Sequence, residues 1–359
     1  MLLYVWKWVN GQGKFVKDRV IDDATSIIWE CGCWTAGSFE LYIRATHELM
    51  DLFHNHMTLI TRPDHREAMI PEKVQLTTDA ENGDYLTISG SSAEIMLSYR
   101  IFVRQWYYQN WYAESMIRDM LNTQLINPDD LARKNPLIVL GENHGWYERA
   151  SAQVTGNNLL SVISDVCKSL QWGFYLAWDD STGYFTFDIY KGADHSGGSL
   201  LPAVVFSPEY GNIANTTYTR DHSTYYNSVY VGGEGEGFNR IIENSRTGLG
   251  GIWLRELWID ARSTSSNTEG GTLTPTEYAN LLEAEATEEL ALHKDTVTYS
   301  GEIIDTNMYT YDVDYKLGDK VAVVNEYGIR GTAIVSAITE VEDETGYRIY
   351  PTLTEWSVD

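Results

Sequence analysis

The sequence predicts an α+β fold that is mainly β, with two small barrel-like β domains joined by α+β insertions. Three observations support this. Short segments rich in β-branched and aromatic residues, separated by turn residues, fill the chain before residue 105. The chain also ends in such segments, from residue 297 to residue 354. Between the two, the hydrophobic period changes from two to 3.6, which is typical of helices.

Residues 1–105 are predicted to form the first barrel-like domain. A hairpin turns at residues 10–13, and a second turn at residues 35–38 separates two further strands. Thr46–Met57 has one apolar face and is predicted to be a short helix. The predicted strands are Leu2–Trp8, Phe15–Val20, Ile27–Trp29, Phe39–Ile43, Leu59–Thr61, Ala68–Gln75 and Tyr85–Gly90.

Residues 106–200 are predicted to be an α+β domain. An apolar stripe from Ala113 to Leu125 predicts one helix, which should end at Asn127-Pro128 because proline cannot continue it. Asn158 is placed to cap a second helix. A hairpin should follow, with strands 174–178 and 184–190.

The rest of the chain is predicted to form a second β domain that is discontinuous in sequence. Residues 201–239 and 296–359 would build it together, because both are rich in strand patterns. Residues 240–295 would form a small separate lobe with one strand and one helix. Thr274-Pro275-Thr276-Glu277 is a capping box that should open this helix.

Composition excludes several function classes. The 359 residues include 26 Lys and Arg against 51 Asp and Glu, a net charge of −25. Such a chain lacks the clustered cations that hold nucleic acid or an anionic membrane, so we expect no stable nucleic-acid binding. No apolar run reaches the roughly 20 residues that a membrane-spanning helix needs, so no membrane anchor is expected.

No sequence motif indicates an enzyme, a metal or a cofactor. The chain lacks G-x-S-x-G, P-loop, G-x-G-x-x-G and HExxH patterns. Cys31 and Cys33 form a single C-x-C pair, whereas zinc ribbons need two separated pairs. Nothing in the sequence places Cys31 or Cys167 beside a histidine, so no nucleophile pair is predicted.

A series of short motifs runs through the chain in a fixed order. Near the start, a strand ends in Trp29, Gly37 follows in a turn, and Phe39-Glu40-Leu41 begins the next strand. Near the end, Tyr315–Val321 reads YKLGDKV, the most specific of the motifs. The full set of motif positions is Trp29, Gly37, Phe39, Arg100, Gly211, Asn212, Asn227, Val231, Gly235, Gly237, Arg240, Asp260, Arg262, Leu317, Gly318 and Asp319.

In this order and spacing, the motifs resemble the tail-hub (baseplate-hub) family of tailed phages and prophages. The resemblance implies a structural virion protein of the tail tip: a trimeric hub, made in the bacterial cytoplasm, that lets DNA pass. The implied partners are the distal tail protein, the tail tube, the tape-measure protein and a receptor-binding or fibre protein on the distal side. It also implies the hub portion without the hydrolase or fibre module of longer members, and no catalytic residues.

Two other functions stay open at this point. The chain could be a cell-wall hydrolase acting on peptidoglycan, since a pair among 51 carboxylates could be catalytic. It could also be a carbohydrate-binding adhesin that uses exposed Trp and Tyr side chains. If the chain is a hub, we expect a neutral to acidic inner wall, with candidates at Glu234–Glu236 and Asp312–Asp319, because fixed cations would retain DNA.

Overall fold

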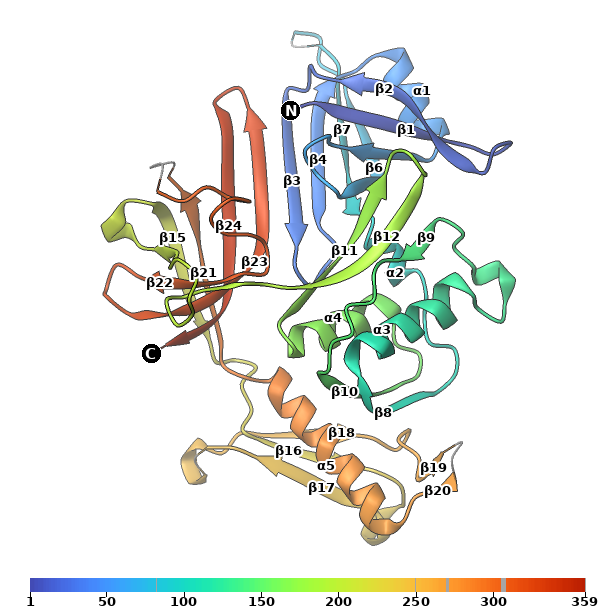
Figure 1. The fold of residues 1–359 in the computed structure, drawn as a ribbon, viewed down its shortest axis with the longest axis vertical. Helices are drawn as coiled ribbons and strands as arrows, with labels where there is room; N and C mark the ends of the chain where they lie inside the picture. The colour runs from blue at the N-terminus through green and yellow to red at the C-terminus, as the bar shows by residue number, and fades with distance from the viewer. Residues whose placement is uncertain (82, 249, 269–270, 305–307, 359) are drawn as a thin grey trace. The chain divides into compact units, whose positions relative to one another are not determined.

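The computed structural model describes residues 1–81, 83–248, 250–268, 271–304 and 308–358, and it divides into two compact units (Figure 1). Unit 1 comprises Met1–Thr217 and Tyr299–Asp359, and unit 2 comprises Tyr218–Thr298. Two strands, β15 (Ile213–Asp221) and β21 (Thr296–Ile303), contain the points where the chain passes from one unit to the other. Unit 2 is therefore an insertion within unit 1.

One large sheet organises unit 1, and the prediction of a mainly β fold is confirmed. Its order is β15-β21-β24-β23-β3-β4-β7-β6-β5-β1-β2, with β22 branching from β23, and the described pairings do not close on themselves. The N-terminal strands are β1 (Leu3–Val9), β2 (Lys14–Ile21), β3 (Ser26–Gly32), β4 (Ser38–Arg44), β5 (Thr58–Thr61), β6 (Ala68–Thr77) and β7 (Tyr85–Ser92). The C-terminal strands are β22 (Lys320–Val324), β23 (Arg330–Asp343) and β24 (Gly346–Val358).

The two ends of the chain meet where β23 pairs with β3. The antiparallel register runs from Ala337 opposite Gly32 to Glu342 opposite Ile27. Side chains alternate along β3 and β4, so that Trp29, Phe39 and Leu41 are buried while their neighbours are more exposed. This pairing makes the N-terminal strands and the C-terminal strands parts of one sheet.

The segment 106–200 has the predicted helices and hairpin. Helix α3 (Ala113–Leu121) continues into a wide turn, η1 (Asn122–Ile126), before the proline, and the side chain of Asn158 caps α4 (Leu159–Ser169) by accepting from Ser161 N at 3.0 Å. The strands are β8 (Trp106–Tyr112) paired with β10 (Arg149–Val154), and the hairpin β11 (Trp172–Asp179) and β12 (Tyr184–Lys191) flanked by β9 (Ile138–Leu140).

Unit 2 is a three-stranded sheet covered by one helix. Strand β16 (Ser228–Gly232) lies between β17 (Ile242–Arg246) and β18 (Glu256–Asp260), and α5 (Pro275–Leu292) packs on the sheet. The predicted capping box is present: Thr274 and Glu277 bond each other's backbone N–H. The core is Val229, Val231, Ala261, Tyr278, Leu282, Ala286 and Leu290.

The boundary of this lobe differs from the expectation that it begins at residue 240. Strand β16 lies at the centre of unit 2, because its Val229 and Val231 fill the core beneath α5. The earlier part of the segment does join the C-terminal strands, because β14 (Val205–Phe206) pairs with β22 and β15 is the neighbour of β21 in the sheet. Alternation in the sequence showed that both segments are strands but not which sheet each one joins.

The remaining short elements complete the order. They are α1 (His47–Asn55), α2 (Ile95–Ser98), β13 (Asp194–His195), β19 (Asn267–Thr268) and β20 (Gly271–Thr272). Among the described residues, no helix has both the length and the apolar character needed to cross a bilayer.

Candidate functional site

A cluster of charged side chains is buried inside unit 1, where segments distant in sequence converge. We call it the junction cluster. It brings together β3, the polar loop between β5 and β6, the start of α2 and β23. Its members are Cys31, Arg62, His65, Arg66, Glu67, Glu94 and Glu340.

Glu340 lies at one end of the junction cluster and is 2% exposed. Arg62 Nη1 and His65 Nε2 each lie 2.9 Å from its carboxylate oxygens. The hydroxyl of Tyr347 donates to it at 2.6 Å. Since a buried charge is costly unless it is paired, these three partners allow Glu340 to remain ionised on a sheet strand.

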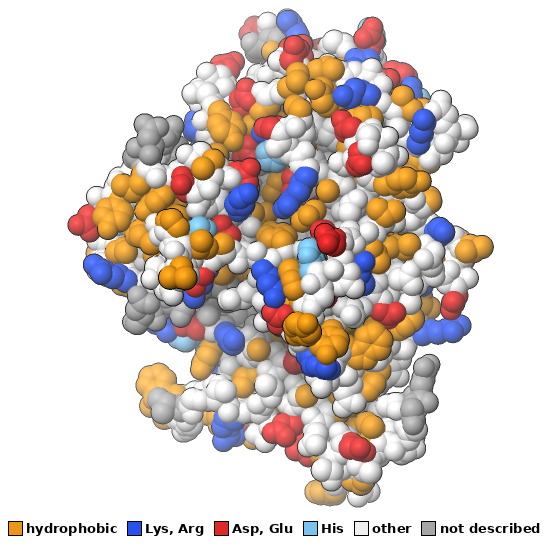
Figure 2. All heavy atoms as spheres, viewed as in Figure 1, with side chains coloured by type: hydrophobic (Ala, Val, Ile, Leu, Met, Phe, Trp, Pro, Cys, Tyr) orange, Lys and Arg blue, Asp and Glu red, His pale blue; other side chains and the backbone are white. Residues whose placement is uncertain are grey.

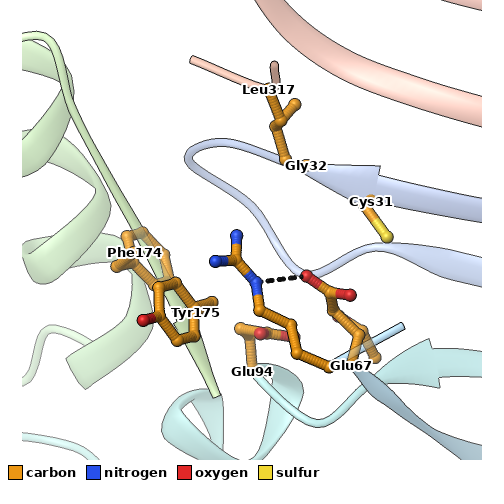
Figure 3. A pocket seen from close by; sticks show the side chains of 9 residues that line it. Cys31, Gly32, Glu67, Glu94, Phe174, Tyr175 and Leu317 are labelled. Atoms are coloured by element: carbon orange, nitrogen blue, oxygen red, sulfur yellow. Dashed lines mark hydrogen bonds and ion pairs between the residues drawn. The ribbon is translucent and has the colours of Figure 1, made fainter. Parts of the chain in front are cut away.

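Glu67 lies at the other end, where its backbone bridges to Ala177 of the β11–β12 hairpin; Figure 3 shows it with Phe174 and Tyr175 of that hairpin around the same pocket. Arg66 Nε donates to its Oε1 at 2.9 Å, and the Arg66 guanidinium stacks 3.6 Å from the ring centroid of Tyr175. Trp178 N donates to Arg66 O at 2.8 Å. The loop between β5 and β6 is thus joined both to the hairpin and, through Glu340, to β23.

A small cavity lies beside Glu67. Its volume of about 10 Å³ suits one water-sized particle. Glu94, which is 4% exposed, lines the cavity; its Oε1 accepts from Leu176 N at 2.7 Å, whereas its Oε2 accepts no hydrogen bond from the part of the chain that the structure describes. The other lining residues are Cys31, Gly32, Arg66, Glu67, Ser92, Phe174, Tyr175 and Leu317.

Burial and pairing shift the pKa values of these groups in opposite directions. Burial by itself would lower the pKa of His65, but its contacts with Glu340 and Glu67 outweigh burial and raise the pKa to about 9. Burial would raise the pKa of Glu67, but His65 and Arg66 lower it to about 2. Glu94 has no cationic partner of this kind, so burial raises its pKa.

The structure brings Cys31 to a histidine, which the sequence analysis did not predict. Ligand atoms of Cys31, His65 and Glu67 lie within 4.8 Å of one another. Burial raises the pKa of the Cys31 thiol well above its ordinary value, the reverse of an activated nucleophile. The sequence signal was the polar run from Arg62 to Glu67 between two buried strands, which required some internal partner.

Three N-terminal motif positions, Trp29, Gly37 and Phe39, lie on strands β3 and β4 or in the turn between them, next to the junction cluster. The Trp29 ring is fully buried, 6.0 Å from the His65 ring and 6.5 Å from the Phe39 ring. At Gly37 an added Cβ would lie 2.0 Å from Glu30 O, so the close approach of β3 and β4 requires glycine. Arg100 lies elsewhere, donating to Arg133 O at 2.8 Å.

The Leu317-Gly318-Asp319 turn fastens the end of the β11–β12 hairpin to the C-terminal strands. Asp319 accepts from Ala193 N at 2.6 Å with Oδ1 and from Lys316 N at 2.7 Å with Oδ2. Gly318 has φ of +92°, and its carbonyl oxygen would lie 1.8 Å from a Cβ added at Gly192. Leu317 lines the cavity of the junction cluster, so this motif and the cluster are neighbours.

Gly211 and Asn212 form a separate turn next to β14. Gly211 ends a short 3-10 helix with φ of +64°. The Asn212 side chain accepts from Ser207 N at 3.0 Å and donates to Val205 O at 2.7 Å. These contacts hold the turn closed on itself.

Seven motif positions lie in unit 2. Asn227 donates to Trp253 O at 3.0 Å and accepts from Arg255 N at 2.8 Å, which fixes the loop before β18. Arg240 donates to Gly232 O at 2.7 Å and to Asp260, which also pairs with Arg262. The remaining positions are Val231 in the core and Gly235 and Gly237, both with positive φ.

Both units also expose large apolar side chains, and Figure 2 shows them interspersed with charges of both signs on the viewed face. Phe238, Ile252 and Trp253 of unit 2 are largely exposed. In unit 1, an open hollow of about 600 Å³ is lined by His144–Glu148 and Lys191, with the Trp146 ring stacked on His144 at 4.7 Å.

Comparison with known proteins gives a consistent result. Residues 2–353 match the family model described as Siphovirus ReqiPepy6 Gp37-like protein. No curated protein matches the chain at a significant level.

Three solved structures share the fold over nearly the full length of both chains. A tail protein from Neisseria meningitidis MC58 is 14% identical, with 98% of this chain and 96% of that chain covered and a TM-score of 0.57. The prophage MuSo2 43 kDa tail protein from Shewanella oneidensis is 11% identical, with 98% of each chain covered and a TM-score of 0.55. The prophage tail protein gp18 from Listeria monocytogenes EGD-e is 12% identical, with 99% and 94% covered and a TM-score of 0.51.

Proposed function

The chain belongs to the siphovirus ReqiPepy6 Gp37-like family of phage tail proteins, and from this premise we propose that it is a structural hub of the tail tip. Three copies form a ring that joins the tail tube and the distal tail protein to the tip, and DNA passes through the ring. The observation that carries this proposal is the shared fold with tail proteins over at least 94% of each chain. The role requires no catalytic chemistry.

The exposed apolar side chains of unit 2 support an assembled state. Phe238, Ile252 and Trp253 are exposed, and a second chain packing on them would remove them from water, as large aromatic residues are enriched at protein interfaces. A cyclic ring is built from heterologous contacts, in which one face meets a different face of the next copy. A trimer satisfies this condition with one type of contact.

The proposed acidic wall has fewer candidate residues than the sequence suggested. Glu234 accepts hydrogen bonds from Ser265 and Ser266, and Asp319 accepts from two backbone N–H groups, so both carboxylates have structural roles. Asp314 is exposed but accepts from Thr310 N at 2.7 Å, which gives it a structural role as well. Glu236 and Asp312 are exposed, and they are the candidates that we retain for the DNA-facing wall.

Assembly with the distal tail protein tests the hub proposal. The purified chain is mixed with the distal tail protein encoded by the same phage or prophage, and mass is measured by light scattering while particles are imaged by negative-stain electron microscopy. We expect a threefold ring. A chain that stays monomeric in the mixture at high concentration contradicts the proposal.

The two alternative functions have their own measurements. The hollow near Trp146 and Lys191 is the surface that would suit a glycan, since aromatic rings pack on sugars. Saturable glycan binding by the monomer that is lost in Trp146→Ala would support an adhesin. Release of soluble fragments from purified peptidoglycan would support a hydrolase, and under the hub proposal neither occurs.

A further inference from the structure

The donor atoms of the junction cluster are a set that metals bind. Cys31 Sγ and ligand atoms of His65 and Glu67 lie within 4.8 Å of one another in the interior of unit 1. A thiolate, an imidazole nitrogen and a carboxylate are the three ligand types of protein zinc sites. The sequence predicted no metal here because these residues belong to one strand and a distant loop.

The orientation of His65 is that of a metal ligand. Its Nε2 lies 2.9 Å from Glu340, and its Nδ1 lies 3.5 Å from Glu67 Oε2. The second distance exceeds the roughly 2.7–3.2 Å of an ordinary N–H···O hydrogen bond. It matches the roughly 3.4 Å that separates two ligand atoms each about 2.0–2.2 Å from a tetrahedral zinc.

The surrounding residues hold these ligands as outer partners do in zinc sites. Histidine ligands usually donate their other ring N–H to a carboxylate, and Glu340 is that carboxylate. Arg62 and Tyr347 fix Glu340 in turn. Arg66 bonds only Glu67 Oε1, which leaves Oε2 facing His65.

Glu94 provides an independent observation. Its carboxyl group is buried and lines the same small cavity as Cys31 and Glu67; among the described residues its Oε2 makes no hydrogen bond of good geometry, although the Ser92 side chain lies nearby. A buried oxygen without a partner costs about 1–3 kcal/mol, so such an atom calls for an explanation. The explanation is that this oxygen, or one water in the cavity that bonds it, occupies the fourth ligand position of a metal ion.

The charges of the cluster fit a divalent cation. With Cys31 as thiolate and Glu67, Glu94 and Glu340 ionised, four negative charges face the two positive charges of Arg62 and Arg66. The Asp64 partner of Arg62 is 62% exposed and is screened by water. A zinc-bound His65 is neutral, and one divalent ion then brings the interior to neutrality; without metal, protons on Cys31 and His65 do the same.

We propose that Cys31, His65 and Glu67 bind a structural Zn²⁺ ion, with Glu94 or a water as the fourth ligand. The ion fastens β3 to the loop between β5 and β6 and, where Glu94 is the fourth ligand, to the start of α2. Because ligand binding by the folded state adds to its stability, the ion would also stabilise unit 1. This inference is independent of the hub function.

Metal titration of the full chain tests the site directly. The chain is freed of metal with a chelator and titrated with Co²⁺, followed by Zn²⁺. We expect one equivalent of cobalt to give a thiolate-to-cobalt charge-transfer band and tetrahedral d–d bands, and zinc to remove both. A wild-type chain that gives no such band, and that contains no zinc by elemental analysis after zinc incubation, overturns the proposal in favour of the protonated cluster.

Two cysteine variants separate this site from adventitious binding. Cys31→Ser removes the charge-transfer band, whereas Cys33→Ser keeps it, because the buried Cys33 lies near the Tyr190 hydroxyl and outside the cluster. A band that survives in Cys31→Ser, or that disappears only in Cys33→Ser, contradicts the assignment. Circular dichroism checks that both variants are folded.

Glu340 is a positioning residue under this proposal. Glu340→Gln keeps the size of the side chain but removes the negative charge that faces the His65 ring N–H. We therefore expect zinc affinity to fall about 10–100-fold with the cobalt spectrum preserved. Competition with a chromophoric chelator measures this change. Unchanged affinity in a folded Glu340→Gln chain contradicts the outer role of Glu340.

Discussion

At the residue scale, the motif positions act mainly by satisfying backbone groups at turns. Asp319 accepts one backbone N–H with each carboxylate oxygen, from Ala193 and Lys316. In two other loops, the side-chain oxygens of Asn227 and Asn212 each accept one backbone N–H, from Arg255 and Ser207. In a sequence, such residues can be recognised as polar residues at predicted turns, but the fold decides which backbone groups they bond.

We predict that Asp319→Asn destabilises unit 1 by about 1–3 kcal/mol. An amide has one acceptor oxygen, so one of the two N–H groups must lose its partner. The matched control is Asp312→Asn, since the Asp312 carboxylate pairs with Lys316 at the surface, its one ion pair among the described residues, and should change stability by at most about 1 kcal/mol.

Urea unfolding followed by hydrogen exchange in peptides around residues 193 and 316 measures the difference. Equal destabilisation by the two substitutions would contradict the role assigned to Asp319.

At the scale of elements, helix α5 shows how a lobe can be built on a few contacts. Its capping box fixes where the helix begins, and Tyr278, Leu282, Ala286 and Leu290 bury one stripe against β16 and β17. Most of the rest of its surface is polar or acidic, apart from alanines and the exposed Leu292. The stability of unit 2 therefore depends on this stripe.

We predict that Leu282→Ala costs about 2–5 kcal/mol and weakens unit 2 selectively, because a fully buried leucine leaves a cavity. Leu292→Ala on the same helix is the control; Leu292 is 58% exposed, and its loss should stay within about 0.5 kcal/mol.

Hydrogen exchange should increase in peptides from residues 228–260 and stay unchanged in residues 26–44. Loss of protection in both units to the same extent would contradict their independence.

At the scale of the whole molecule, unit 2 is inserted between two strands of unit 1. The chain leaves unit 1 at Thr217 and returns at Tyr299, and β15 and β21, which contain these residues, are neighbours in the sheet. A short link can therefore replace the insertion without stretching either strand.

We predict that replacing residues 218–298 with a short Gly/Ser linker leaves unit 1 folded. Protection of β3, β23 and β24 against hydrogen exchange should match that of the full chain. The control deletes the β11–β12 hairpin, which bonds Glu94 through Leu176 N, and this deletion should abolish cooperative unfolding. An aggregated linker variant with no protected core would contradict the prediction.

The sequence by itself determined the local features of this protein. It determined the helix starting at Asn158 and the capping box at Thr274, as well as most strands and the tail-protein family. These features depend on residues a few positions apart, whose hydrogen bonds and steric limits operate in almost any context. They could be predicted for that reason.

Only the tertiary structure decided which distant segments share a core. It placed β16 under α5, paired β23 with β3, and brought Cys31, His65, Glu67 and Glu340 together. Alternation shows that a segment is a strand but not its neighbour, because both candidate sheets bury the same apolar face. A buried ionic cluster depends on contacts between segments hundreds of residues apart, and no local pattern specifies these.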